Sequence, residues 1–141
     1  MGKDKYSYGT FGPKHLEVIQ KGLALYNVQK FWECHEELED HWIEDPGDQA
    51  RLVYWAVIQA ASSCYHYRNE NLVGALGLLK KTLKKLEKME IGGVETDLVY
   101  QHLDWKNFKG LIRQIPLDNT SLHDFKKLFN FKFPILKTGS Q

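Results

Sequence analysis

The middle of the chain holds a segment that is apolar on nearly every side. Residues 52–67 read LVYWAVIQAASSCYHY and include no Asp, Glu, Lys or Arg. A helix over about 49–68 with so little charge has no polar face to turn to water, so we predict a central, heavily buried helix. A chain of 141 residues is long enough to surround that helix with others. The segment therefore predicts an all-α domain.

Apolar residues keep a helical spacing on both sides of this segment. Pro13 suits a first helical turn, and Asn71 and Asp48 are good helix caps. Because the connections are short, neighbouring helices should be antiparallel, in a single up-and-down helical bundle of about five or six helices that forms one domain over residues 1–141. The further helices are expected over about 13–26, 28–44, 72–89, 97–115 (interrupted near Asp104) and 121–129.

The last residues, FNFKFPILKTGSQ at 129–141, alternate apolar and polar side chains, but Pro134 disfavours a central strand. We expect an extended C-terminal tail that lies over a helical core, with a disordered end. This core can belong to the same chain or to a second copy, so the sequence leaves a homo-oligomer open.

Composition excludes several classes of protein. The net charge is +1, so bulk charge selects no partner. No window approaches the roughly 18–20 uninterrupted apolar residues of a membrane span, and the N-terminus, MGKDKYSYGTFGPKH, lacks the apolar core of a signal peptide. We therefore expect a cytoplasmic protein with no membrane partner. In that compartment Cys34 and Cys64 should be small buried side chains and not a disulfide.

Charge is nevertheless distributed unevenly along the chain. Residues 31–48 hold eight acidic residues and no Lys or Arg, whereas residues 80–88 hold five lysines and one glutamate. Runs of this kind are usually solvated helix faces. The Lys80–Lys88 face could also contact phosphates in a nucleic-acid adaptor, but no clear platform for base stacking accompanies it. Nucleic acid is therefore not the expected partner.

The segment FWECHEELEDHW places polar groups beside large apolar ones. His35 lies on the apolar face of the predicted helix and Glu39 on its shoulder, with Glu36 at the border. The following helix carries Gln59 and His66 in an apolar stripe. In a straight hairpin Gln59 comes within reach of His35 or Glu39, whereas His66 lies about 12 Å further along. Because buried polar groups need partners, we interpret these residues as one polar centre.

Two interpretations of this centre stay open. In the first, a His35–Glu39 contact supported by Gln59 locks the two helices together. In the second, His35 and Glu39 bind a divalent metal ion in a hydrolase, and Glu36 is a weak candidate for the catalytic base. The pair supplies only two ligands, because Glu39 stands where the HExxH zinc motif has its second histidine. The sequence candidates for a further ligand are His15 and Glu17.

Two segments together resemble a known family. HEELEDHW at 35–42 and VIQAASSCYHYRNENLVGALGLL at 57–79 resemble the HExLExxW motif and the GNxxGA-like turn of the small helical family of domains of unknown function numbered three hundred and nine. The match covers about 15–90, and 116–141 looks like an extension. The family's glycine before the turn asparagine is Glu70 here, so a left-handed turn should be uncomfortable and the turn is expected to differ. The resemblance implies an all-helical, bundle-like fold and almost nothing about activity. The matching residues are His35, Glu36, Leu38, Glu39, Trp42, Gln59, His66, Asn71, Gly74 and Ala75.

The leading functional prediction is a binding or interaction module that uses a semi-buried pocket near the polar centre, with enzyme activity left open. A metal-dependent hydrolase and a nucleic-acid adaptor are the alternatives. The candidate binding residues are His35, Glu36, Glu39, Trp42, Gln59 and His66. The expected apolar walls are Trp32, Trp42, Trp55 and Tyr67.

Overall fold

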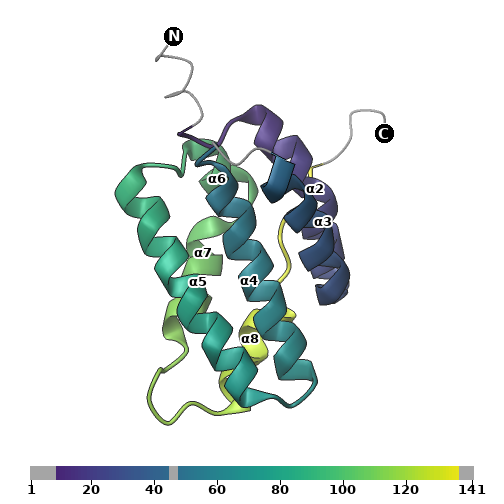
Figure 1. Cartoon of the computed structure of the whole chain (residues 1–141), viewed down its shortest axis with the longest axis vertical. Helices are drawn as coiled ribbons and strands as arrows, with labels where there is room; N and C mark the ends of the chain where they lie inside the picture. The colour runs from purple at the N-terminus through teal and green to yellow at the C-terminus, as the bar shows by residue number, and fades with distance from the viewer. Residues whose placement is uncertain (1–8, 45–47, 137–141) are drawn as a thin grey trace.

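The computed structural model describes residues 9–44 and 48–136, and Figure 1 shows helices throughout this part of the chain. No strand occurs among the described residues, which confirms the all-α class. A regular up-and-down order of all the helices and a single domain over 1–141 stay predictions. The elements are α2 (Pro13–Asn27), α3 (Phe31–Glu44), α4 (Arg51–Arg68), α5 (Leu72–Gly92), α6 (Asp97–His102), α7 (Trp105–Gln114), a 3₁₀ helix η1 (Leu122–Phe125) and α8 (Lys126–Asn130).

The described residues form eight helical elements, more than the five or six expected. The region 97–115 breaks, as predicted, at Asp104, whose φ of 51° is left-handed. The single helix expected over 121–129 is instead η1 followed by α8. The helix expected from residue 28 begins only at Phe31, because Gln29 has a φ of 62° and cannot belong to a right-handed helix. Within the described ranges, no helix is both long enough and apolar enough to cross a membrane.

Helix α4 occupies the centre of the arrangement, as predicted. In Figure 1 it lies in front between α5 and α3, with α7 and α8 behind it, and its most extensive contacts are with α3 and α5. Most of its side chains are buried. One stripe is not, because Trp55, Ser62, Tyr65 and His66 are only half-buried. The sequence therefore predicts the position of α4 correctly but misses that one face of it stays partly open.

The C-terminal tail covers the core of its own chain. Residues 131–136 are extended, as predicted, and Asn27 of α2 holds them in place. Its Nδ2 donates to the Phe133 carbonyl at 2.8 Å, and its Oδ1 accepts the Phe133 N–H at 2.7 Å. Deeper in the core, the Tyr26 hydroxyl donates to the Leu128 carbonyl at 2.7 Å. The predicted disorder of the chain end falls on residues 137–141, which lie outside the described part.

The turn between α4 and α5 sets how these two helices meet. Asn71 caps α5 as predicted, because its side-chain oxygen accepts the Gly74 N–H at 3.0 Å. Glu70 takes the left-handed conformation, with a φ of 58°, although it has a side chain. Such a residue costs about 1–2 kcal/mol relative to glycine. The turn thus keeps a glycine-like geometry despite Glu70, contrary to the expectation that it would differ.

Candidate functional site

The residues of the two sequence segments gather on one side of the layer formed by α3, α4 and α5. Each helix contributes a stripe of residues spaced by three or four positions, which is one helical face. We call these three stripes together the α4 face. On α3 the stripe is Trp32, His35, Glu39 and Trp42; on α4 it is Trp55, Gln59, Ser62 and His66; on α5 it is Gly74, Leu78, Lys81 and Lys85.

A cavity of about 200 Å³ lies at one end of the α4 face. Aromatic rings form much of its wall: the Trp32 and Tyr65 centroids are 5.9 Å apart, and Tyr65 meets His66 edge-on at 5.7 Å. Trp32 is 51% exposed, which is unusual for so large an apolar side chain. Tyr67, a predicted wall, instead packs on Phe129 on another side of α4, with centroids 4.9 Å apart. The cavity is lined by Phe31, Trp32, Ser62, Tyr65, His66 and Leu78.

His35 does not form the predicted contact with Glu39. Its ring instead stacks on Trp32, with centroids 5.3 Å apart and planes 18° apart. Its Nδ1 is buried and has no hydrogen-bond partner among the described residues. Glu39 is half-buried and Glu36 exposed, and neither takes part in a hydrogen bond or ion pair within the described part of the chain. The interpretation as a helix-locking His35–Glu39 pair is therefore wrong.

Gln59 also turns away from the predicted partners. With its amide oriented to suit its neighbours, Nε2 donates to the Lys81 carbonyl at 3.2 Å, and Oε1 accepts from Trp55 Nε1 at 3.2 Å. Gln59 therefore ties α4 to α5, whereas the expected contact with His35 or Glu39 would have tied it to α3. Gln59 is only 6% exposed, so this polar side chain is buried and satisfied within the α4–α5 contact.

The other end of the α4 face is aromatic and cationic. Trp42 and Trp55 stack with centroids 4.4 Å apart. The Arg51 guanidinium lies 4.2 Å from the Trp42 ring centroid, and Lys85 Nζ lies 5.8 Å from that of Trp55. Burial lowers the pKa of Lys85, and the neighbouring cations add to this effect. Trp42 Nε1 is buried without a partner among the described residues, like His35 Nδ1.

His66 packs closely against the start of α5 at Gly74. The Asn71 amide donates to its Nδ1 at 3.1 Å. A Cβ added at Gly74 would lie 2.7 Å from the same Nδ1, so only glycine fits there without a shift. The α4–α5 turn thus fixes the His66 side chain at the rim of the cavity.

The described residues do not gather a full set of metal ligands around His35 and Glu39. Among residues 9–44 and 48–136, no group of three or more His, Cys, Asp or Glu side chains lies close enough to hold a metal ion. His15, a candidate further ligand, instead accepts the Gly12 N–H at Nδ1 and donates from Nε2 to Asp48 at 2.5 Å. Glu17 is exposed. Within residues 9–44 and 48–136, His35 and Glu39 therefore have no third ligand of the kind that a metal-dependent hydrolase needs.

Asp48 has a second role beside its contact with His15. Asp48 is not the predicted cap of α4, because the N-cap is Ala50. Asp48 is buried, and its Oδ1 accepts the Ala50 N–H at 3.0 Å, so it orders the turn that enters α4. The two cysteines are free and buried, as predicted. Burial raises the pKa of the Cys64 thiol to about 12 and that of Cys34 still further, so neither is a nucleophile at neutral pH.

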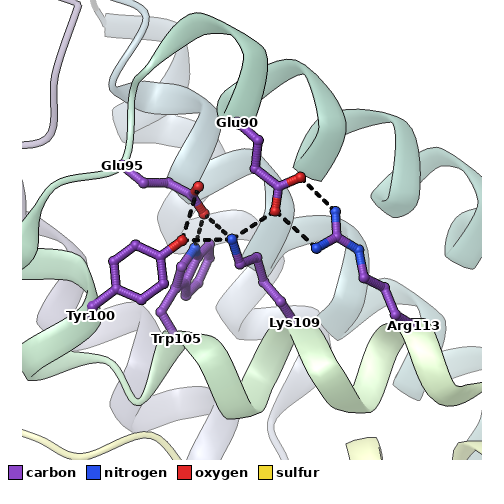
Figure 2. Close-up of polar contacts among 6 residues, drawn as sticks. All are labelled: Glu90, Glu95, Tyr100, Trp105, Lys109 and Arg113. Atoms are coloured by element: carbon purple, nitrogen blue, oxygen red, sulfur yellow. Dashed lines mark hydrogen bonds and ion pairs between the residues drawn. The ribbon is translucent and has the colours of Figure 1, made fainter.

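A polar network outside the predicted site joins α5, α6 and α7. Figure 2 shows Lys109 at its centre, only 7% exposed, with its ammonium group 2.7 Å from Glu90, 2.9 Å from Glu95 and 2.7 Å from the Tyr100 hydroxyl. All three ammonium donors thus have a partner. Arg113 binds both carboxylate oxygens of Glu90, at 2.7 and 2.8 Å. Trp105 Nε1 donates to Glu95. This satisfied cluster fastens α7 to the end of α5 and is structural.

The network should make stability depend on pH in acid. Hydrogen bonding to Arg113 holds the pKa of the Glu90 carboxyl at about 2, against an ordinary value of 4.5. Because the folded pKa lies below the unfolded one, the stabilisation is complete above pH 4.5 and is lost as the pH falls toward 2. We expect Arg113→Leu to move the acid midpoint of unfolding, followed by circular dichroism, to higher pH. The exposed control Lys106→Leu should leave it unchanged, and equal midpoints for both variants would contradict the assignment.

Comparisons with known proteins find similarity over the segment that carries the described motifs. The model of the family "Domain of unknown function (DUF309)" matches residues 19–78. The chain is 37% identical over 65 residues to the uncharacterized protein YpuF of Bacillus subtilis (strain 168), a match that covers 46% of this chain and 37% of YpuF. The chain thus spans well under half the length of this relative. No solved structure matches the chain. Residues 19–78, which include α3, α4 and the start of α5, are thus similar to the DUF309 family.

Proposed function

We propose that this chain is a cytoplasmic interaction module that binds a protein partner on the α4 face, with one partner side chain entering the cavity beside Trp32. The observation that carries the proposal is the exposure of Trp32 at the rim of an aromatic cavity. Binding energy in protein interfaces concentrates on aromatic residues of this kind, next to pockets that exclude water. An exposed tryptophan contributes little to the fold, so a contact with a partner explains it better.

The size of the cavity argues for a side chain as the occupant. Sites for cofactors and drug-sized molecules usually measure about 300–1,000 Å³, whereas this cavity measures about 200 Å³. Its walls are mainly apolar, with Ser62 and His66 as the polar groups. A single aromatic or aliphatic side chain matches that volume and that chemistry.

Two polar atoms beneath the α4 face support the same proposal. His35 Nδ1 and Trp42 Nε1 are buried without partners among the described residues. An unpaired buried polar group costs about 1–3 kcal/mol. Both atoms lie on the side of α3 that carries the face, where a partner's polar groups or bridging water would satisfy them after a small side-chain movement.

Side-chain analogues test the cavity without knowledge of the partner. We expect indole and p-cresol, followed by ¹H–¹⁵N NMR, to shift the signals of Trp32, Tyr65 and His66 at about millimolar concentration. Ser62→Phe fills the cavity and should abolish these shifts. Val73→Phe adds the same ring on the exposed side of α5 and should not change them. Shifts that are absent from the wild type, or that survive Ser62→Phe, would contradict the proposal.

A further inference from the structure

The α4 face has opposite charges on its two long edges. Glu36 and Glu39 border it on α3, and neither has an intrachain partner among the described residues. Lys81, Lys85 and Lys88 border it on α5 and are exposed or half-buried. No charged side chain of α4 lies between the two edges beyond Arg51 at its start. The face is therefore acidic along one side, aromatic in the middle and basic along the other.

The acidic and basic edges lie at the same level along α4. Contacts between Trp32 and Tyr65 and between Trp42 and Trp55 place Glu39 level with residues near Gln59. Gln59 in turn bonds to the Lys81 carbonyl on the opposite side. Glu39 and Lys81 thus flank the same turn of α4, on opposite sides of it.

This arrangement is complementary to itself. A two-fold axis that lies in the interface and runs parallel to α4 keeps every residue at its level and places α3 of one copy over α5 of the other. Glu39 of each copy then faces Lys81 of its partner, and the contact occurs twice. A two-fold axis across α4 would instead place α3 over α3 and α5 over α5, with like charges opposed. The charge pattern therefore selects one geometry of pairing.

The exposed apolar side chains fit the same geometry. Trp32 is level with Tyr65, and Ser63 on the next turn donates to the Ala75 carbonyl of α5 at 2.8 Å. In the parallel two-fold pairing, Trp32 of one copy therefore reaches the part of α5 between Gly74 and Leu78 in the other. Each copy would thus cover the other's exposed tryptophan.

We infer that the partner on the α4 face is a second copy of this chain, held by Glu36 and Glu39 of each copy against Lys81 and Lys85 of the other. The inference rests on the proposed function and names its partner. A face as long as α4, about 27 Å, and three helices wide buries roughly 500 Å² on each copy. The total of about 1,000 Å² is at the lower limit for a specific interface. The dimer should therefore be weak and in exchange with monomer.

Sedimentation equilibrium of the full chain tests this inference. We expect reversible dimerisation between about 5 and 500 µM, weakened by raising salt from about 50 to 500 mM. Glu39→Lys alone and Lys81→Glu alone should each weaken association at least tenfold, because each opposes like charges twice. An equimolar mixture of the two variants should restore a dimer, since every pair is again opposite in sign.

Matched variants make the result specific to the face. Asp40→Lys and Lys80→Glu carry the same charge changes on exposed positions of α3 and α5 outside the α4 face, and they should dimerise like the wild type. A monomer at every concentration, or a dimer that Glu39→Lys and Lys81→Glu do not weaken, would overturn the inference. Indole binding by the monomer would then still support the proposed function, so the two can fail separately.

Discussion

Replacing Lys109 with methionine should lower the free energy of unfolding by about 3 kcal/mol, because the change breaks a buried charge network from its centre. Lys109 lies between Glu90 and Glu95, and its ammonium group also contacts the Tyr100 hydroxyl. Burial opposes the charge of Lys109, but these hydrogen bonds outweigh it and raise its pKa above the ordinary value. Methionine keeps most of the apolar stem and leaves the Glu95 carboxylate, which is 6% exposed, without its cation.

Urea unfolding of two lysine variants on the same helix measures this effect. Lys106→Met changes an exposed lysine of α7 and should alter the free energy of unfolding by less than about 0.5 kcal/mol. A double variant, Lys109→Met with Glu95→Gln, should lose less than the sum of the two single changes, because the second removes the charge that the first leaves unpaired. Equal losses for Lys109→Met and Lys106→Met would show that the network contributes nothing.

Gly22→Ala should cost about 2 kcal/mol, although alanine is the better helix former. Gly22 is buried on α2, and a Cβ added there would lie 2.4 Å from two carbon atoms of Leu38. Real Cβ atoms do not approach that closely, so α2 and α3 would have to move apart or Leu38 would have to leave its rotamer. Both responses disturb a core in which Leu38 is fully buried.

Two other helical glycines provide matched controls. A Cβ added at Gly77 or Gly110 meets nothing within 4 Å. Alanine at these positions should therefore raise the free energy of unfolding by up to about 1 kcal/mol through helix propensity alone. Thermal unfolding of the three variants should place Gly22→Ala below the wild type and the others above it. Combining Gly22→Ala with Leu38→Ala should cost less than the sum of both, and strict additivity would contradict the steric explanation.

Periodicity in the sequence predicts the outer helices, because an apolar stripe can be buried in only one direction, and the lack of a polar face in residues 52–67 predicts the central place of α4. It predicts helix ends less well. Gln29, Glu70 and Asp104 all adopt left-handed backbone conformations without being glycine. A break near Asp104 and a turn at Glu70 are predicted, but nothing local marks Gln29. The start of α3 consequently shifts from 28 to Phe31. These turns are imposed by the packing of the helices on either side.

The candidate site is predicted as a surface but not as a set of contacts. Helical spacing correctly brings His35, Glu39, Gln59 and His66 to one side of α3 and α4. It gives the level of Gln59 along α4 but not which neighbouring helix it meets, and the Lys81 carbonyl of α5 is the actual partner. Helical spacing also predicts Tyr67 as a wall of the pocket, but Tyr65 lines the cavity in the structure and Tyr67 packs on Phe129.

The network around Lys109 is missing from the prediction altogether. Its acidic partners, Glu90 and Glu95, belong to the end of α5 and the connection that follows, so no short motif joins them to the lysine. The one available signal is the position of Lys109 directly after Phe108 and four residues after Trp105, within the apolar stripe of α7. A lysine in such a stripe indicates a buried partner for its charge.

The two hydrogen bonds between Asn27 and Phe133 have a consequence for synthesis on the ribosome. The two residues are 106 positions apart, so the Asn27 side chain can bond to Phe133 only after all the intervening residues have been synthesised. The α4 face needs nothing beyond α5, which ends at Gly92, and can assemble roughly 2–8 seconds earlier at ordinary rates of translation. In that interval a nascent chain has a complete α4 face on one side and an uncovered apolar core on the other, where the Tyr26 hydroxyl does not yet have the Leu128 carbonyl as its acceptor. If the α4 face pairs two copies as proposed, growing chains on one polysome would contact each other through this face while their apolar cores are still accessible to chaperones.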